Sequence, residues 1–186
     1  MAVGPFDLTP GSAGIVVNRR KPGHFVVLTE DGRIDAMLAH GGVKLADALE
    51  RRAAIKVINA QHGPNDLSRP LTPAVGVTTV DPSTVTIAMP AEDGEPVVSD
   101  VERDAWSKFR MAYEATLEAK SFKVTGLLLL HASQDPSSLT ERGTDQFVAV
   151  FSPTVQVNGV TLRDTPRDVV LVNRSHLRRV DASLRR

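Results

Sequence analysis

The sequence has no cysteine, few aromatic residues and no net charge. The absence of cysteine excludes disulfides, thiolate metal sites and a cysteine nucleophile. Aromatic residues make up 4% of the chain, so Val, Leu, Ile and Ala must pack most of any core. Its 22 basic residues balance 22 acidic ones. A protein dominated by nucleic-acid affinity would need an excess of Lys and Arg, which this composition does not supply.

Long apolar runs are also missing. No segment approaches the ~18 consecutive apolar residues of a membrane span, and residues 1–14 lack the basic start and apolar run of a signal peptide. We therefore expect a cytoplasmic protein with no membrane partner. The chain also lacks a phosphate-binding glycine loop and a G-x-S-x-G nucleophile motif. The sequence accordingly predicts no cofactor and no metal, and it assigns no catalytic residue.

Strand signals dominate what is present. Residues 24–29 and 33–38 are rich in β-favouring side chains and flank Glu30-Asp31-Gly32, a pattern typical of a β-hairpin. Residues 44–52 carry Leu and Ala at helical spacing, which favours a short helix. Further strands are predicted at 54–60, 75–80, 84–89, 122–132, 147–157 and 168–180, with a loop over 61–74.

One longer helix is predicted at 99–118. Ser99 followed by Glu102 forms a capping box, in which each side chain satisfies a backbone N–H at the start of the helix. Apolar residues then recur at three- and four-residue spacing, and they include Trp106. Such a stripe usually packs into a core, so we expect this one to be buried. The fold class is therefore mainly β with one clear α-helix.

The order of elements recurs in the two halves, which suggests an internal duplication. Residues 33–40, 44–49 and 55–60 in the first half correspond to 123–131, 138–142 and 147–157 in the second. Each half then closes with a β-run, at 84–89 and 169–180. His40 and His131 fall at matching strand ends, where each is expected to bond to backbone or, alternatively, to act as a repeated ligand.

Two segments carry a resemblance to a known family. The turn at 44–49 and the closing run Val-Leu-Val-Asn-Arg-Ser-His-Leu at 170–177 resemble a small uncharacterised bacterial domain family of Sm-like, bent five-stranded barrels. The resemblance implies two such barrels related by duplication, with helix 99–118 where Sm-like domains carry an N-terminal helix. It implies no activity.

These observations divide the chain into three parts. Residues 1–23, rich in Gly and Pro, form an N-terminal arm; residues 24–93 form the first Sm-like unit. Residues 94–186 hold the linker helix, the second unit and a basic tail. A barrel of this size has little core of its own, which favours association through unpaired strand edges into a homo-oligomer. An acidic stretch at 81–104 and a basic one at 167–186 would suit a contact within the chain or between subunits.

Three function classes stay open at this point. The first is a non-enzymatic oligomeric scaffold or adaptor whose partners are further copies of the chain and other proteins. The second is RNA binding through the last strand, where Sm-like proteins can line an RNA pocket, and an enzyme of unrecognised type is the third. The candidate nucleic-acid-binding residues are Asn173, Arg174, His176, Arg178 and Arg179.

Overall fold

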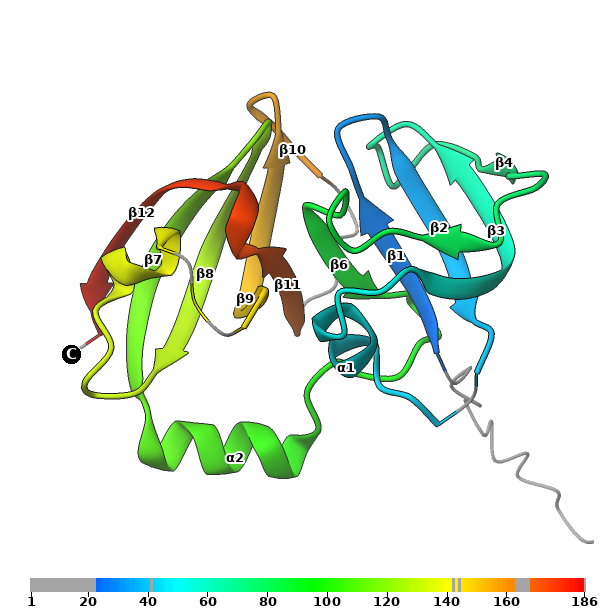
Figure 1. Cartoon of the computed structure of the whole chain (residues 1–186). Coiled ribbons are helices and arrows are strands. Elements are labelled where there is room, and N and C mark those ends of the chain that lie inside the picture. Colours follow the sequence, from blue (N-terminus) through cyan, green and yellow to red (C-terminus); the bar gives the residue numbers. More distant parts are fainter. Residues whose placement is uncertain (1–22, 41, 142, 144, 163–167, 186) are drawn as a thin grey trace, which may run out of the picture.

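The computed structural model describes residues 23–40, 42–141, 143, 145–162 and 168–185, and it is mainly β (Figure 1). The arm predicted at 1–23 lies outside these residues except for Gly23. The first half contains β1 (His24–Leu28), β2 (Arg33–Leu38), α1 (Leu45–Glu50), β3 (Ile55–Gly63), β4 (Thr72–Pro73), β5 (Thr79–Val80) and β6 (Ile87–Pro90). The second half contains α2 (Asp100–Phe109), β7 (Met111–Ala119), β8 (Phe122–Leu130), the 3-10 turn η1 (Pro136–Thr140), β9 (Phe147–Val157), β10 (Val160–Thr161), β11 (Val169–Asn173), the 3-10 turn η2 (Arg174–His176) and β12 (Leu177–Leu184).

The strands form one continuous antiparallel sheet. Their order is β12-β7-β8-β9-β11-β6-β1-β2-β3-β4, with β10 added to β9 and β5 added to β3. The two halves meet where β11 pairs with β6, in the register Leu171 opposite Ala88 and Val172 opposite Ile87. The mainly-β prediction is therefore confirmed, whereas closure into two barrels and their origin by duplication stay predictions. Of the helices in the described part of the chain, none has the length and apolar character that crossing a membrane requires.

Several local predictions are confirmed. The hairpin around Asp31-Gly32 is formed by β1 and β2, and Gly32 has a φ of 142°, which favours glycine. The short helix predicted at 44–52 is α1, and the strand at 147–157 is β9. Other boundaries shift: the predicted loop over 61–74 is wrong at its start because β3 continues to Gly63, and the strand at 75–80 shortens to β5.

The helix predicted at 99–118 is correct only in its first half. Its capping box is present, since the Ser99 hydroxyl accepts from the Glu102 N–H and the Glu102 carboxylate accepts from the Ser99 N–H. The helix ends at Phe109, and after Arg110 the chain continues as the nine-residue strand β7. In β7 the buried side chains are Ala115, Leu117 and Ala119, which alternate with less buried neighbours. This two-residue period, typical of a strand, was concealed by apolar residues that also fit helical spacing.

The expected burial of the helical stripe is also wrong. No side chain of α2 is fully buried, and Val101 and Phe109 are each 79% exposed. Only one side of the helix contacts the rest of the protein. There Trp106 packs edge-on against Phe151, with ring centroids 5.9 Å apart, and the Arg103 guanidinium lies over the same Phe151 ring.

The third strand of each half bends at a bulge of the same kind. In β3 the register shifts opposite Ala36, and Asn59 there has a φ of 54°. In β9 it shifts opposite Gly126, and Ser152 has a φ of 47°. A bulge bends its strand and increases the local twist, so both halves of the sheet curl at matching places.

The central strands are buried on both faces, and each face supports a core. In β1, for example, Phe25 and Val27 belong to one core cluster while Val26 and Leu28 belong to the other. The first cluster lies mainly in the first half, yet it includes four residues of β9 and β11: Phe147, Phe151, Val169 and Leu171. The second cluster likewise includes Ile87 and Met89 of β6. Each half therefore completes the core of the other.

Candidate functional site

The junction of β6 and β11 holds three of the five residues predicted to bind nucleic acid. Asn173, at the end of β11, is fully buried. Its side-chain amide donates to the carbonyl oxygens of Val85 at 2.8 Å and Pro82 at 3.2 Å, and its oxygen accepts from Ser175. The amide therefore joins the turn before β6 to the end of β11, and both of its polar atoms are engaged within the chain.

Arg174 holds the loop that precedes β9. Its guanidinium donates to the carbonyl oxygens of Leu139, Ser138 and Glu141, each at 3.1 Å. A charged donor that satisfies several carbonyls stabilises a loop more strongly than neutral hydrogen bonds do. Arg174 therefore fixes η1 against η2, and this guanidinium is committed to backbone rather than directed at solvent.

His176 faces the first half of the chain. Its Nδ1 shares a 3.1 Å hydrogen bond with the Thr86 hydroxyl, just before β6. Burial, and then the positive charge of Lys120, lower the pKa of His176 below its ordinary value of 6.5. The neutral imidazole is therefore the favoured form here. The acidic segment 81–104 and the basic segment 167–186 thus adjoin within the chain, through the β6–β11 ladder and these hydrogen bonds.

Arg178 and Arg179 differ from the other three candidates because both are exposed on β12. The Arg179 guanidinium pairs with the Asp181 carboxylate at 2.9 Å on the same strand. The structure therefore brings the five predicted residues together along β11, η2 and β12 but gives them two different environments. Three join parts of the fold, and two present positive charge to solvent. His40 and His131, at the matching strand ends, are also exposed.

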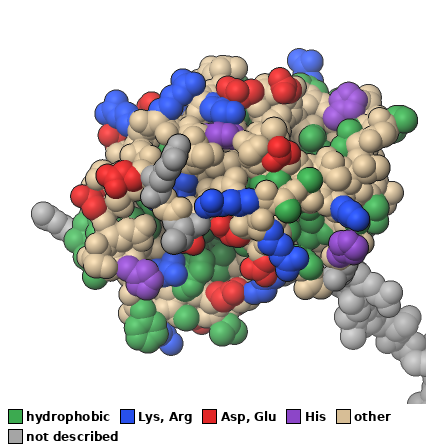
Figure 2. Space-filling model, viewed as in Figure 1, with side chains coloured by type: hydrophobic (Ala, Val, Ile, Leu, Met, Phe, Trp, Pro, Cys, Tyr) green, Lys and Arg blue, Asp and Glu red, His purple; other side chains and the backbone are tan. Residues whose placement is uncertain are grey.

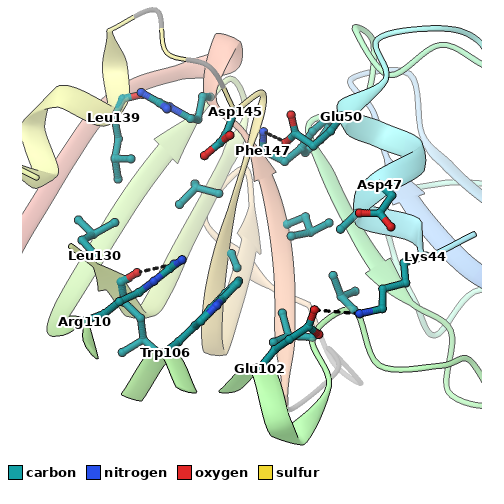
Figure 3. A pocket seen from close by; sticks show the side chains of 18 of the residues that line it. Lys44, Asp47, Glu50, Glu102, Trp106, Arg110, Leu130, Leu139, Asp145 and Phe147 are labelled. Carbon is teal, nitrogen blue, oxygen red and sulfur yellow. Dashed lines mark hydrogen bonds and ion pairs between the residues drawn. The ribbon is translucent and has the colours of Figure 1, made fainter. Parts of the chain in front are cut away.

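A cleft of about 280 Å³ lies where the two halves and α2 meet. In Figure 3, α1 lies on one side of it, η1 and the strands of the second half on the other, and α2 beneath. Its apolar lining comes from both halves: Ala46, Val97, Val98, Trp106, Leu129, Leu130, Leu139, Phe147, Val148, Ala149 and Leu171. Figure 2 shows the same region as a hollow with hydrophobic side chains inside and charged side chains around it.

The charged groups of the cleft mainly form hydrogen bonds and ion pairs between different helices and strands. The Glu50 carboxylate, at the end of α1, accepts hydrogen bonds from the backbone N–H groups of Gln146 and Phe147, both at 2.8 Å. The Lys44 ammonium lies 2.8 Å from the Glu102 carboxylate and so links the start of α1 to α2. The hydrogen bonds from Lys44 and Ser99 lower the pKa of Glu102 to about 2.

The single tryptophan forms one wall of the cleft. The Arg110 guanidinium lies over the Trp106 ring, 4.1 Å from its centroid, in a cation–π contact. Burial lowers the pKa of Arg110 from its ordinary value. Neither Glu50 nor the Trp106–Arg110 stack was predicted as a site. The hydrogen-bond partners of Glu50 lie almost 100 residues away in the sequence, and no local motif marks the stack, although its two residues are only four positions apart.

A second polar cluster joins β1 to β2 and to the turn after β6. The His24 imidazole contacts the Asp93 carboxylate through Nδ1 and the Asp35 carboxylate through Nε2, the latter at 2.7 Å. Burial disfavours the charged imidazolium, but the hydrogen bonds that its N–H groups donate to Asp35 and Asp93 outweigh burial and raise the pKa of His24 above 6.5. Among the described residues, no group of three His, Asp or Glu side chains has an arrangement that could hold a metal ion.

The chain was also compared with known proteins. A scan against protein-family models gives no match, and searches of curated proteins and of solved structures return no similar protein.

Proposed function

We propose that this chain is a non-enzymatic, cytoplasmic scaffold or adaptor that assembles into homo-oligomers from Sm-like units. The observation that carries the proposal is the β6–β11 junction. There β6, the last strand of the first half, pairs with β11 of the second half, so the strand edges of the two units already pair with each other. In the same way that β6 pairs with β1 and β11 pairs with β9, β12 pairs with β7 and β5 pairs with β3. Strand β12 is therefore the counterpart of β6, and β5 the counterpart of β11, so we expect these two edges to pair between chains.

The matching bulges support two equivalent units. Asn59 and Ser152 occupy the same place in the third strand of each half, opposite Ala36 and Gly126. A short helical segment, α1 or η1, lies between the second and third strands of each half. A tight turn then leads into the last strand of each half: the turn at 81–84 precedes β6, and η2 precedes β12. These shared features are those expected of a duplicated Sm-like unit.

The outer edge of β12 is suited to pairing with another chain. Its last four residues, 181–184, are exposed and pair with β7 on one side only in the described part of the chain. The Arg185 N–H donates to the Ala112 carbonyl of β7. Because N–H groups alternate in direction along an antiparallel strand, those of Ala182 and Leu184 point away from β7. An unpaired row of this kind is a template for adding a strand.

RNA binding is a second candidate, and the exposure of Arg178 and Arg179 favours it. Their guanidinium groups lie on β12, beside the edge proposed for assembly. Only this pair, of the five predicted residues, is directed at solvent. An RNA complex would therefore depend on these two arginines and would weaken steeply with added salt.

The test is the absolute mass in solution of the chain and of two variants, measured by light scattering during size-exclusion chromatography. Ala182→Pro removes the outward N–H of β12 but keeps the pairing with β7, since proline is tolerated at strand edges. Ala182→Ser keeps the N–H and is the matched control. We expect a discrete oligomer for the chain and for Ala182→Ser, and a loss of that oligomer for Ala182→Pro.

Two results would contradict the proposal. One is a 20.0 kDa monomer at every concentration of the unmodified chain. The other is an oligomer that Ala182→Pro leaves unchanged, because assembly would then not use this edge. A shift in mass upon adding short RNA at low salt, lost in Arg178→Ala/Arg179→Ala, would favour RNA binding instead.

A further inference from the structure

The outer face of α2 is an apolar ridge without a partner in the described part of the chain. Val101, Ala105 and Phe109 are spaced four residues apart, so they lie in one line along the helix. All three are exposed, and Val101 and Phe109 are 79% exposed. Figure 2 shows hydrophobic side chains at the surface along the lower edge of the molecule, where Figure 1 places α2. Large apolar side chains gathered in this way usually mark an interaction surface.

The ridge is held outward by contacts on another side of the helix. Trp106 packs on Phe151, and Glu102 pairs with Lys44 of the first half. These contacts lie about 100° around the helix from the ridge, as helical geometry requires for residues one position away from Val101 and Ala105. A rotation of α2 that buried the ridge would break them, so any cover for the ridge has to come from another molecule.

We propose that the ridge binds the same ridge of a second copy of this chain, with the two α2 helices antiparallel. The ridge is symmetric about Ala105, with one large apolar residue four positions away on each side. A two-fold axis at Ala105 therefore sets Val101 of each chain against Phe109 of the other, and the small Ala105 side chain lets the helices approach. Rows of residues at four-residue spacing pack against each other in the commonest class of helix contact.

The charges beside the ridge fit this partner. Asp104 and Lys108 are exposed and lie on the same flank of the ridge, one position before and three positions after Ala105. A two-fold axis brings the same flanks together in reversed direction, so each Asp104 meets a Lys108 of the other copy. A parallel two-fold arrangement would instead bring opposite flanks together, so Asp104 and Lys108 would not meet. Two ion pairs thus select the antiparallel dimer.

The contact is small, and its affinity is expected to be modest. A ten-residue helix buries less area than the ~1,200–2,000 Å² of a standard stable interface. When this is the only contact between two chains, the dimer is therefore expected only at high protein concentration. This ridge is separate from the β12 edge, so the two contacts are independent, and together they would strengthen one another through multivalency.

The experiment uses a charge exchange in the Ala182→Pro background, which removes edge pairing. Sedimentation velocity over a range of concentrations gives the dimer dissociation constant. Asp104→Lys and Lys108→Asp, made singly, each place like charges together twice in the dimer and should weaken it at least about twofold, the smallest effect expected from the loss of two exposed ion pairs. The double exchange restores opposite charges and should recover the affinity of the background. Ala105→Glu sets two carboxylates at the two-fold axis and should abolish the dimer.

The control is that circular dichroism and the Trp106 emission remain unchanged, since all substituted residues are exposed. A chain that stays monomeric at millimolar concentration in this background would overturn the proposal. So would a double exchange no better than either single change, or an Ala105→Glu variant that still dimerises. Because Ala182→Pro already removes the edge contact, these results are distinguishable from a failure of the scaffold proposal.

Discussion

The two halves of the molecule support themselves in different ways. In the second half, β7, β8 and β9 are nine to eleven residues long, and β12 returns to pair with β7. In the first half, β1 and β2 have five and six residues, and the sheet ends in the two-residue strands β4 and β5. The first half therefore has fewer ladder hydrogen bonds of its own. Its core is completed by α1 and by four residues of the second half that pack into it: Phe147, Phe151, Val169 and Leu171.

This difference shows why the two halves are joined by a shared sheet rather than by a linker alone. A small β-unit exposes much of its surface and is marginal by itself. When β6 pairs with β11, the central strands are covered on both faces, which accounts for their continuous apolar sequences. The comparison predicts that the halves unfold together despite their unequal ladders.

The largest expected effects come from core truncations in each half. Leu49 of α1 and Leu117 of β7 are both 0% exposed. Leu49→Ala and Leu117→Ala should each lower the free energy of unfolding by about 2–5 kcal/mol, through lost apolar contact and a cavity. Urea unfolding followed by far-UV circular dichroism and by Trp106 emission measures this loss.

The shape of the unfolding curve tests the shared core. Each variant should shift one single transition, with both probes coincident. Two separate transitions, with Leu49→Ala moving one and Leu117→Ala moving the other, would show instead that the halves are independent domains.

A smaller effect is expected at the polar link between the halves. Glu50→Ala leaves the N–H groups of Gln146 and Phe147 without their acceptor. The expected loss of unfolding free energy is about 1–3 kcal/mol, the range for leaving a buried hydrogen-bond donor without an acceptor. The matched control is Asp47→Asn on the exposed side of the same helix, which should stay within about 0.5 kcal/mol of the unmodified chain. Equal losses for both variants would contradict a role for Glu50 in joining the halves.

The smallest expected effect is on how the free energy of unfolding depends on pH, because a histidine in each half has a shifted pKa and the two shifts are opposite. The pKa of His24 is raised in the folded state, so the stability that it contributes is present below about pH 6.5 and is lost as the pH rises through the folded value. The pKa of His176 is lowered, so its neutral form stabilises the fold above pH 6.5, and that stability is lost as the pH falls through the interval below.

Substitution should therefore change the pH profile in opposite directions. Removing His24 by His24→Gln should reduce the decline of unfolding free energy on the alkaline side. His176→Gln should reduce the decline on the acidic side. Urea unfolding at half-unit steps from pH 5 to pH 9 measures both slopes, and parallel profiles for the two variants would show that the opposing shifts are wrong.

Much of the fold follows from local sequence signals. The Asp31-Gly32 hairpin, α1, the capping box at Ser99 and the strand at 147–157 are all predicted by turn chemistry, side-chain periodicity or runs of β-branched residues. The extension of the helix past Phe109 is wrong because the segment that follows satisfies both helical and strand periods. Pairing with β8 and β12 then decides in favour of a strand. Such tertiary pairing is absent from a local pattern.

The site was harder to predict than the fold. Asn173 and Arg174 have the side chains that RNA recognition needs, yet the structure uses them to join Val85, Leu139 and neighbouring carbonyls. Hydrogen-bonding capacity can be seen in the sequence, but its partner depends on contacts about 35 to 90 residues away. The cleft and the His24 cluster depend on the same long-range contacts, so no spacing in the chain marks them.

The most direct test of the central claim is residue-resolved hydrogen exchange along β12 of the unmodified chain at low and high protein concentration. The outward amides of Ala182 and Leu184 should exchange quickly when dilute and slowly when concentrated, because a strand of another chain then accepts their hydrogen bonds. The inward amides of Ser183 and Arg185, paired with β7, should be slow at both concentrations and serve as the internal control. Fast exchange of Ala182 and Leu184 at every concentration would contradict assembly through this edge.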